Sequence, residues 1–243
     1  NPNQLGCEFP SKALAGVGVA FYLLARLSSY RSQLGKSASK VAQYLDLVAL
    51  GTYADVASLD YNNRILVDAG VKRIQQNQCR AGISALLDIA GRDPAQLKAQ
   101  DLGFVLGPRV NAAGRMETMD IGIECLLAQD MQTAYPLAQQ LNDFNIERRQ
   151  VELQMKQQAL VELEKLQLDQ QHLPATLVMF NEHWHQGVIG IVAGRLKEQF
   201  HRPSIVFAAD DDGIHIKGSA RSIEGVHIRD AIEMIAEQYP HLV

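Results

Sequence analysis

One acidic residue, Asp55, follows the apolar run LDLVAL and a glycine in the stretch GTYADVASLD. A carboxylate close to a buried segment is costly unless it is hydrogen-bonded, ion-paired or bound to a metal. Two interpretations are open: Asp55 is a metal ligand, or it ends a helix and its side chain accepts backbone N–H groups. A single carboxylate cannot hold a catalytic metal by itself. The first interpretation therefore requires further ligands from other segments.

The segment LGPRVNAAGR places two arginines, Arg109 and Arg115, around small residues and the amide of Asn111. Arginine forks bind phosphate oxygens through paired hydrogen bonds. The glycines predict a loop whose backbone a ligand can approach closely. The segment therefore indicates a phosphate-binding loop, and the alternative is an ordinary surface loop with two solvated arginines.

Two later segments, HWHQGVIG and KGSARS, also suit an anion. The first joins a strand end to a helix start, where backbone N–H groups and the helix dipole favour phosphate. His185 lies in this segment, and its alternative role is to cap the turn while Trp184 packs. The two histidines of this segment lack a third zinc ligand at a suitable spacing. The second segment carries Ser219 beside Lys217 and Arg221, and such a group can hold a phosphate, although serines and an arginine are also commonplace on strands.

Short amphipathic helices are predicted across the first two-thirds of the chain, because apolar residues recur there at three- and four-residue steps. The first helix is expected after Ser11 as its N-cap, and the second is expected to stop at Gly51. A third is expected to start at Asn62 or Asn63. Asp55 therefore falls just after the second helix.

A long, polar and glycine-free stretch from about 138 to 167 predicts a mostly solvated helix. A helix of ~30 residues is ~45 Å long, and we expect it to bridge two domains. After it, apolar segments over 175–180 and 204–208 flank a helical segment over 188–200. This order predicts a right-handed, parallel β-α-β unit, followed by one more strand and a last helix.

The composition describes an ordinary globular chain of 243 residues, 47% hydrophobic and 21% charged. The longest apolar run, residues 13–25, is too short to span a bilayer. Three widely separated cysteines argue against a disulfide scaffold and favour a reducing cytoplasm. The net charge of −4 gives no global signal for nucleic acid. Binding of a polyanion must therefore depend on where a few cations are placed.

Taken together, four runs closely resemble the RecJ family of single-stranded-DNA exonucleases, within the DHH phosphoesterase superfamily. They are LDLVALGTYADVASLDYNNRILV, DLGFVLGPRVNAAGRM, HWHQGVIGIVAGRLKEQFHRPSIVF and KGSARSI, and the resemblance covers essentially the whole chain in order. It implies an α/β fold in three parts. These are the mainly helical C-terminal part of a DHH domain over 1–130, a long bridging helix over 131–171, and a partial α/β DHHA1-type domain with a small mixed sheet over 172–243.

The resemblance also implies roles for individual residues. Asp55 looks like a catalytic metal ligand of the family, which uses Mn²⁺ or Mg²⁺ to remove 5′-nucleotides from single-stranded DNA by two-metal hydrolysis in a cleft between two domains. The nucleic-acid-binding residues that it implies are Arg109, Asn111 and Arg115 near the metals, and His185, Ser219 and Arg221 on the DHHA1 side. For base stacking, which single-strand binders use, Trp184 is the best placed aromatic residue.

Several elements of the family have no counterpart in the sequence. They are the paired-aspartate motif, the next single aspartate, the Asp-His-His signature and a later glycine-histidine element. We therefore expect an internal fragment of a larger bacterial, cytoplasmic exonuclease of DNA repair and recombination. We expect the fragment alone to be inactive, because two-metal hydrolysis needs several carboxylates and histidines.

Two other functions stay open on sequence alone. One is a DHH-family oligoribonuclease or cyclic-dinucleotide phosphodiesterase, and the other is a non-catalytic module that binds nucleic acid. The expected partner is single-stranded DNA, and a single-strand-binding protein is an open further partner. We expect a monomer and no membrane partner.

Overall fold

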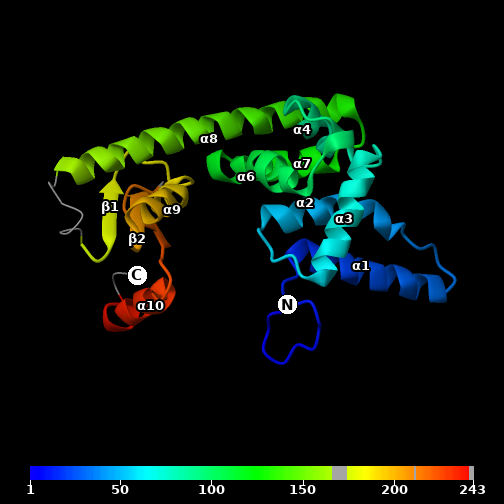
Figure 1. Ribbon diagram of the computed structural model, residues 1–243, viewed down its shortest axis with the longest axis horizontal. Helices are drawn as coiled ribbons and strands as arrows, with labels where there is room; N and C mark the ends of the chain where they lie inside the picture. Colours follow the sequence, from blue (N-terminus) through cyan, green and yellow to red (C-terminus); the bar gives the residue numbers. More distant parts are fainter. Residues whose placement is uncertain (166–173, 211, 241–243) are drawn as a thin grey trace. The chain divides into compact units, whose positions relative to one another are not determined.

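The computed structural model describes residues 1–165, 174–210 and 212–240, and it divides into two compact units, Asn1–Asn145 and Ile146–Val243 (Figure 1). Parts of the expected segments lie outside the described residues, namely 166–171 of the bridging helix, and 172–173, 211 and 241–243 of the DHHA1-type part. The long central helix predicted from the sequence is confirmed as α8, Met131–Lys165. Its first turns belong to the first unit and the rest to the second.

The first unit is built from helices. They are α1 (Gly16–Gln33), η1 (Val41–Tyr44), α2 (Leu45–Ala54), α3 (Tyr61–Gln75), α4 (Ala81–Ile89), η2 (Pro94–Gln96), α5 (Ala99–Asp101), η3 (Leu102–Leu106), α6 (Gly107–Met116), α7 (Asp120–Leu127) and the first turns of α8. Two of these elements, η1 and η2, are short 3₁₀ helices, and η3 is a π-helical segment. The mainly helical character predicted for this part of the chain is confirmed.

One hydrophobic core joins most of these helices. On α8, Ala134, Ala138 and Leu141 recur at steps of four and three residues, so they share one face of the helix, and all three are fully buried. The other large, fully buried side chains of this core are Ile74, Ile83, Leu86, Leu87, Leu102 and Leu106. Burial of such faces, rather than intrinsic propensity, stabilises helices as short as these.

The N-caps of α1 and α3 differ from the prediction. Helix α1 begins at Gly16, and Ser11 instead donates a hydrogen bond to Asp60 Oδ2 at 2.6 Å. Asp60 is the N-cap of α3, because its Oδ1 accepts the N–H of Asn63 at 2.8 Å. These bonds, first that from Asn63 and then that from Ser11, lower the pKa of Asp60. The prediction of Ser11, Asn62 or Asn63 as N-cap is therefore wrong, because Asp60 provides the stronger acceptor.

Gly51 does not end the second helix, as the sequence predicted, because α2 continues through it to Ala54. A methyl group at Gly51 would lie 2.8 Å from Val17 Cγ1 of α1. Glycine is therefore required at this position by the close packing of α2 on the start of α1. A glycine that permits a helix crossing has the same local signal as one that ends a helix.

The second unit contains a three-stranded sheet, β1 (Leu177–Asn181), β2 (Ser204–Ala209) and β3 (Ile216–Arg221), in that order. Strands β1 and β2 are parallel and are connected by α9 (Ile189–Phe200), whereas β2 and β3 are antiparallel. A last helix, α10 (Ile228–Gln238), follows. The predicted β-α-β unit and small mixed sheet are confirmed.

Helix α9 covers one face of this sheet, where Leu177, Val206 and Ala208 are buried (Figure 1). The opposite face keeps apolar side chains in solvent: Val178 is 62% exposed and Ile216 is 57% exposed. Successive side chains of a strand alternate between the two faces, which is why β1 reads as buried and exposed by turns. The sheet therefore has one packed face and one open face.

The second part of α8 packs within the second unit through buried and paired side chains. Met155 and Ala159 are buried, and Glu152 Oε1 accepts a hydrogen bond from Arg195 of α9 at 3.0 Å. Across the described ranges, every helix is too short or too polar to cross a membrane.

Candidate functional site

Asp55 lies at the C-terminal end of α2, on the wall of an open pocket of about 290 Å³. The pocket is lined by Ala15, Gly16, Val17, Gly51, Ala54, Asp55 and Asn111. Two predicted site residues, Asp55 and Asn111, therefore meet in one pocket although they come from α2 and α6. The start of α1 also lines it, and α1 has no side-chain cap at Ala15. The first N–H groups and the dipole of α1 favour negative charge in this pocket.

The turn after α2 determines how Asp55 is held. The N–H of Val56 bonds the carbonyl of Tyr53 at 3.2 Å, and the N–H of Ala57 bonds the carbonyl of Thr52 at 3.1 Å. This is the pattern of a Schellman motif. Val56 has a φ of 53°, which is a left-handed conformation that β-branched residues rarely adopt. Its side chain is 87% exposed, so packing does not offset the strain. Backbone strain thus lies directly beside Asp55, a position in which strain often accompanies function.

Replacing Val56 with glycine should raise the free energy of unfolding by about 1 kcal/mol. The left-handed conformation costs an L-residue roughly 1–2 kcal/mol, and glycine avoids that cost but loses more backbone entropy on folding. Urea unfolding followed by circular dichroism measures the difference. Val178→Gly, at an exposed position of β1, is the matched control and should lower stability instead. A destabilised Val56→Gly protein would show that the turn is not strained.

The prediction of a loop over LGPRVNAAGR is wrong, because α6 covers Gly107–Met116 directly after η3. Proline is compatible with the first turn of a helix, where its missing N–H is not needed, and Pro108 occupies that position. Gly107 serves packing rather than ligand approach: a methyl group there would lie 3.3 Å from Ala54 Cβ. This close contact between α6 and the end of α2 brings Asn111 to the pocket.

The two arginines of α6 have different surroundings. Arg109 is half-buried, and its Nε donates to Asn142 Oδ1 at 3.1 Å while its Nη1 donates to the Val105 carbonyl at 2.7 Å. Arg115 and Asn111 are exposed and four residues apart, so they share one side of α6. Arg115 therefore lies one turn beyond the pocket, whereas Arg109 already ties α6 to η3 and α8.

Asp55 and Asn111 offer oxygen atoms, which are the ligands that Mg²⁺ and Mn²⁺ prefer. Within the described ranges, no three His, Cys, Asp or Glu side chains come close enough together to hold a metal ion. The oxygen atoms of Asp55 and Asn111 could therefore supply part of the ligand set of a divalent metal ion. The role of Asp55 as a metal ligand stays a prediction.

In the second unit, Ser219 and Arg221 lie against the start of α9. A methyl group on Gly190, the second residue of α9, would lie 2.8 Å from Ser219 Oγ and 3.0 Å from Arg221 Nη2. Arg221 Nη1 also donates to Ser219 Oγ at 3.2 Å. A hydroxyl group, a guanidinium group and the N-terminus of a helix thus converge, and this combination favours a phosphate group.

The turn between β1 and α9 lies at the same place. His185 Nδ1 accepts the N–H of Gly187 at 3.1 Å, so the predicted alternative, in which His185 caps the turn, is observed. Lys217 Nζ donates to Gln186 Oε1 at 3.0 Å and ties β3 to this turn. Lys217, the lysine of the KGSARS segment, lies two residues before Ser219 and therefore on the same face of β3.

The expectation that Trp184 stacks on bases is wrong. Its side chain is only 4% exposed, and its Nε1–H donates to Gln158 Oε1 of α8 at 2.8 Å. Stacking on a base requires an accessible ring face. Trp184 therefore belongs to the packing of the second unit.

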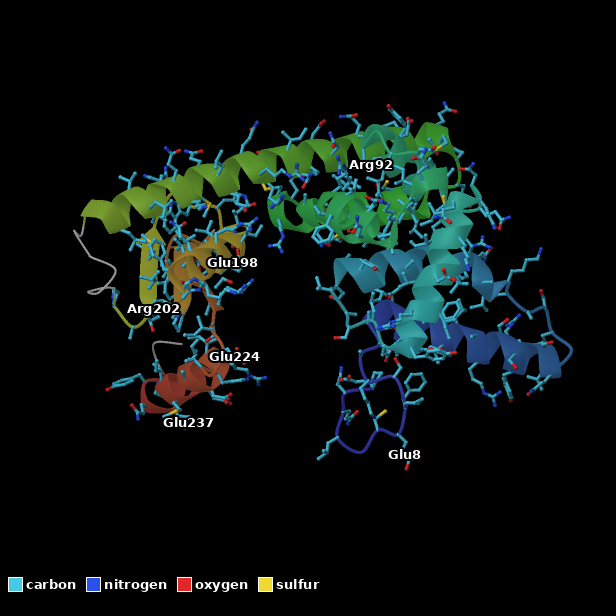
Figure 2. All side chains as sticks on the ribbon, in the orientation of Figure 1. Glu8, Arg92, Glu198, Arg202, Glu224 and Glu237 are labelled. Atoms are coloured by element: carbon cyan, nitrogen blue, oxygen red, sulfur yellow. The ribbon has the colours of Figure 1, made fainter. Side chains whose placement is uncertain are left out.

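The side chains of both units are drawn in Figure 2. The pocket at Asp55 presents oxygen ligands suited to a divalent cation. The start of α9 presents donors suited to a phosphate oxygen. Phosphoester cleavage assisted by a metal requires both kinds of group.

A comparison with protein-family models identifies the kind of domain in the second unit. Residues 173–241 match the family model of the DHHA1 domain. The second unit therefore carries a DHHA1 domain, as the sequence predicted.

The resemblance to RecJ is also confirmed. The chain is 51% identical over its whole length to the single-stranded-DNA-specific exonuclease RecJ of Salmonella typhimurium, and it spans 43% of the length of that relative. Its fold matches crystal structures of RecJ from Thermus thermophilus in complex with Mg²⁺ (TM-score 0.78, 30% identity) and of exonuclease RecJ bound to manganese (TM-score 0.75, 31% identity). These matches cover 95% and 94% of this chain, and 34% and 54% of the matched chains.

Proposed function

We propose that the chain is part of a metal-dependent exonuclease that removes nucleotides from the 5′ end of single-stranded DNA. The observation that carries the proposal is the 51% identity to a RecJ exonuclease across all residues of the chain. The setting that we propose is DNA repair and recombination in the bacterial cytoplasm. We assign the activity to a longer polypeptide, because the chain spans less than half of the relative.

Within this proposal, Asp55 holds a divalent ion, Mn²⁺ or Mg²⁺, through its exposed carboxylate. Such ions, when bound, polarise the phosphoryl group and lower the pKa of a water molecule. The uncapped start of α1 lines the same pocket, and its partial positive charge attracts a substrate phosphate. Asn111 orients that phosphate or the ion through its amide.

The DHHA1 domain is proposed to bind another phosphate of the substrate at the start of α9. Ser219 donates through its hydroxyl and Arg221 through its guanidinium, beside the first N–H groups of the helix. His185 keeps the turn in the shape that presents those N–H groups, since it accepts the N–H of Gly187. Arg109 and Arg115 are proposed as further phosphate contacts along α6.

Arg115→Ala should weaken the binding of single-stranded DNA and flatten its salt dependence. Each lost phosphate contact lowers the slope of log K against log salt concentration by about 0.7 for a single strand. Fluorescence anisotropy with a labelled oligodeoxythymidylate between 50 and 300 mM salt, roughly the range in which such slopes are measured, gives both quantities. Arg92→Ala removes another exposed arginine of the same unit, labelled in Figure 2, and should leave the slope unchanged. Equal slopes for Arg115→Ala and the parent would place Arg115 away from the DNA.

The proposed function is tested with a chimera in which residues 1–243 replace the matching segment of Salmonella typhimurium RecJ. We expect the chimera, with Mn²⁺, to release mononucleotides from the 5′ end of a long single strand and to degrade double-stranded DNA poorly. We expect the 243-residue chain alone to release none, because two-metal hydrolysis needs more ligands than Asp55 supplies. A folded chimera that cleaves only dinucleotides, or nothing, would contradict the proposal.

A further inference from the structure

A second pocket in the first unit, of about 310 Å³, is lined by two arginines. The complete lining is Gln43, Tyr44, Asp46, Arg73, Gln78, Cys79, Arg80 and Gln129, and it shares no residue with the pocket at Asp55. Three glutamine side chains add amide donors at its wall. The lining is thus polar, and its two guanidinium groups are its strongest hydrogen-bond donors.

Arg80 is held rigidly at this pocket. Its side chain is 17% exposed, and it faces the fully buried carboxylate of Asp46, with 3.6 Å between Arg80 Nε and Asp46 Oδ1. This separation is too long for a hydrogen bond. The oxygens of Asp46 are instead taken by the backbone N–H groups of Leu47 and Arg80, at 2.8 and 2.9 Å. The guanidinium also lies 4.8 Å from the centre of the Tyr44 ring, which fixes its orientation.

Arg73 is held from the other side. Its Nη2 donates to the Gln78 carbonyl at 2.7 Å, just beyond the end of α3. The Nε atoms of both Arg73 and Arg80 are buried and have no hydrogen-bond partner in the described part of the chain. A buried donor without a hydrogen-bond partner is costly, and the Nε of Arg80 faces the Asp46 carboxylate at 3.6 Å.

The charges of the lining do not balance. Two of the lining side chains are cationic and one is anionic, which leaves one positive charge in excess. Cys79 does not change this count, because burial raises the pKa of its thiol and keeps it protonated. An anion with several acceptor oxygens would offset the excess charge and accept hydrogen bonds from the guanidinium groups that line the pocket.

We infer that this pocket binds a phosphate group between Arg73 and Arg80. Guanidinium forks match phosphate oxygens, and the pocket is within the volume range of small-ligand sites, roughly 300–1,000 Å³. The phosphate can be free, as inorganic phosphate or a mononucleotide, or can belong to the backbone of a nucleic acid. The inference does not depend on the exonuclease activity proposed above.

The test is a titration of the 243-residue chain with inorganic phosphate, followed by the ¹H–¹⁵N resonances of the arginine Nε–H groups, at an ionic strength kept constant with chloride. We expect phosphate to shift the Nε–H resonances of Arg73 and Arg80 and to slow their exchange with water. Unchanged resonances, or equal changes on addition of chloride alone, would overturn the inference. Parallel titrations with a 5′-mononucleotide and with an oligodeoxythymidylate distinguish the free from the polymeric source.

Arg73→Gln should weaken phosphate binding at this pocket about tenfold or more, because it removes a charged donor. Arg73→Lys keeps the charge but has no Nε–H, and it serves if the first variant is unfolded. Arg92→Gln is the matched control, and Arg221→Ala removes a donor of the phosphate site in the other unit. In Arg92→Gln and in Arg221→Ala, phosphate should shift the Nε–H resonance of Arg80 as it does in the parent. Loss of that shift in Arg221→Ala, or its persistence in both Arg73 variants, would reject the site.

Discussion

Asp55→Ala should lower the rate of single-strand cleavage by at least about a thousandfold in the chimera with Salmonella typhimurium RecJ. Loss of a ligand removes charge and geometry that the metal needs to stabilise the transition state, which is worth several kcal/mol. Binding of single-stranded DNA should change by only a few-fold, because the carboxylate of Asp55 is negatively charged and does not bind the DNA phosphates directly. Steady-state release of mononucleotides and anisotropy measure the two quantities separately.

Asp68→Ala is the matched control for this experiment. Asp68 is also an exposed aspartate on a helix of the first unit, where it pairs with Lys72 at 2.7 Å. Exposed ion pairs contribute little to stability, so the control should cleave at nearly the parent rate. If Asp55→Ala also cleaved at that rate and bound manganese normally, Asp55 would not be a metal ligand.

Gly70→Ala should destabilise the first unit by about 3 kcal/mol. A methyl group at Gly70 of α3 would lie 2.2 Å from the Leu45 carbonyl oxygen and 2.6 Å from Ala49 Cβ of α2. Two helices therefore have to separate, and overpacking of this kind costs about 1–3 kcal/mol or more. Native domains have only about 5–15 kcal/mol of stability, so a large part of it should be lost. Urea unfolding by circular dichroism is the measurement.

Gly16→Ala is the control for Gly70→Ala. It makes the same substitution in a helix of the same unit, but nothing lies within 4 Å of the added methyl group. Alanine is the better helix former by up to about 1 kcal/mol, so this variant should be as stable as the parent or slightly more so. Equal stability of the two variants would mean that α2 and α3 do not pack as closely as described.

Much of the fold was predictable from the sequence because its signals are periodic. The β-α-β order, the small mixed sheet and the long helix α8 all follow from changes in the spacing of apolar residues. Asp55 was also placed correctly at the end of a helix. Its role as a metal ligand stays a prediction, since it depends on partners outside the described residues.

The errors concern residues whose local signal has two meanings. Gly51 and Gly107 looked like a helix stop and a loop residue, but both allow close packing between helices. Trp184 was named as the best placed aromatic residue for base stacking, with packing as its alternative, and tertiary packing against α8 buries it. Packing between segments distant in the sequence determines the role of all three residues, and the pattern of neighbouring residues gives no information about such packing.

The phosphate pocket could not have been predicted at all. Arg73 lies in the last turn of α3, Arg80 is the residue just before α4, and Asp46 lies on α2. Only the folded chain places the Asp46 carboxylate behind the Arg80 guanidinium and brings Arg73 to the same pocket. Short-range patterns carry no signal for such a convergence.

The open face of the three-stranded sheet has a consequence for handling the protein. Val178, Phe180 and Ile216 are exposed apolar side chains on this sheet, and within the described residues its outer strands, β1 and β3, each pair with β2 alone. Surfaces of that kind adhere to one another in concentrated samples. Association of folded molecules, rather than unfolding, should therefore limit how far this chain can be concentrated. Val178→Lys should improve its solubility.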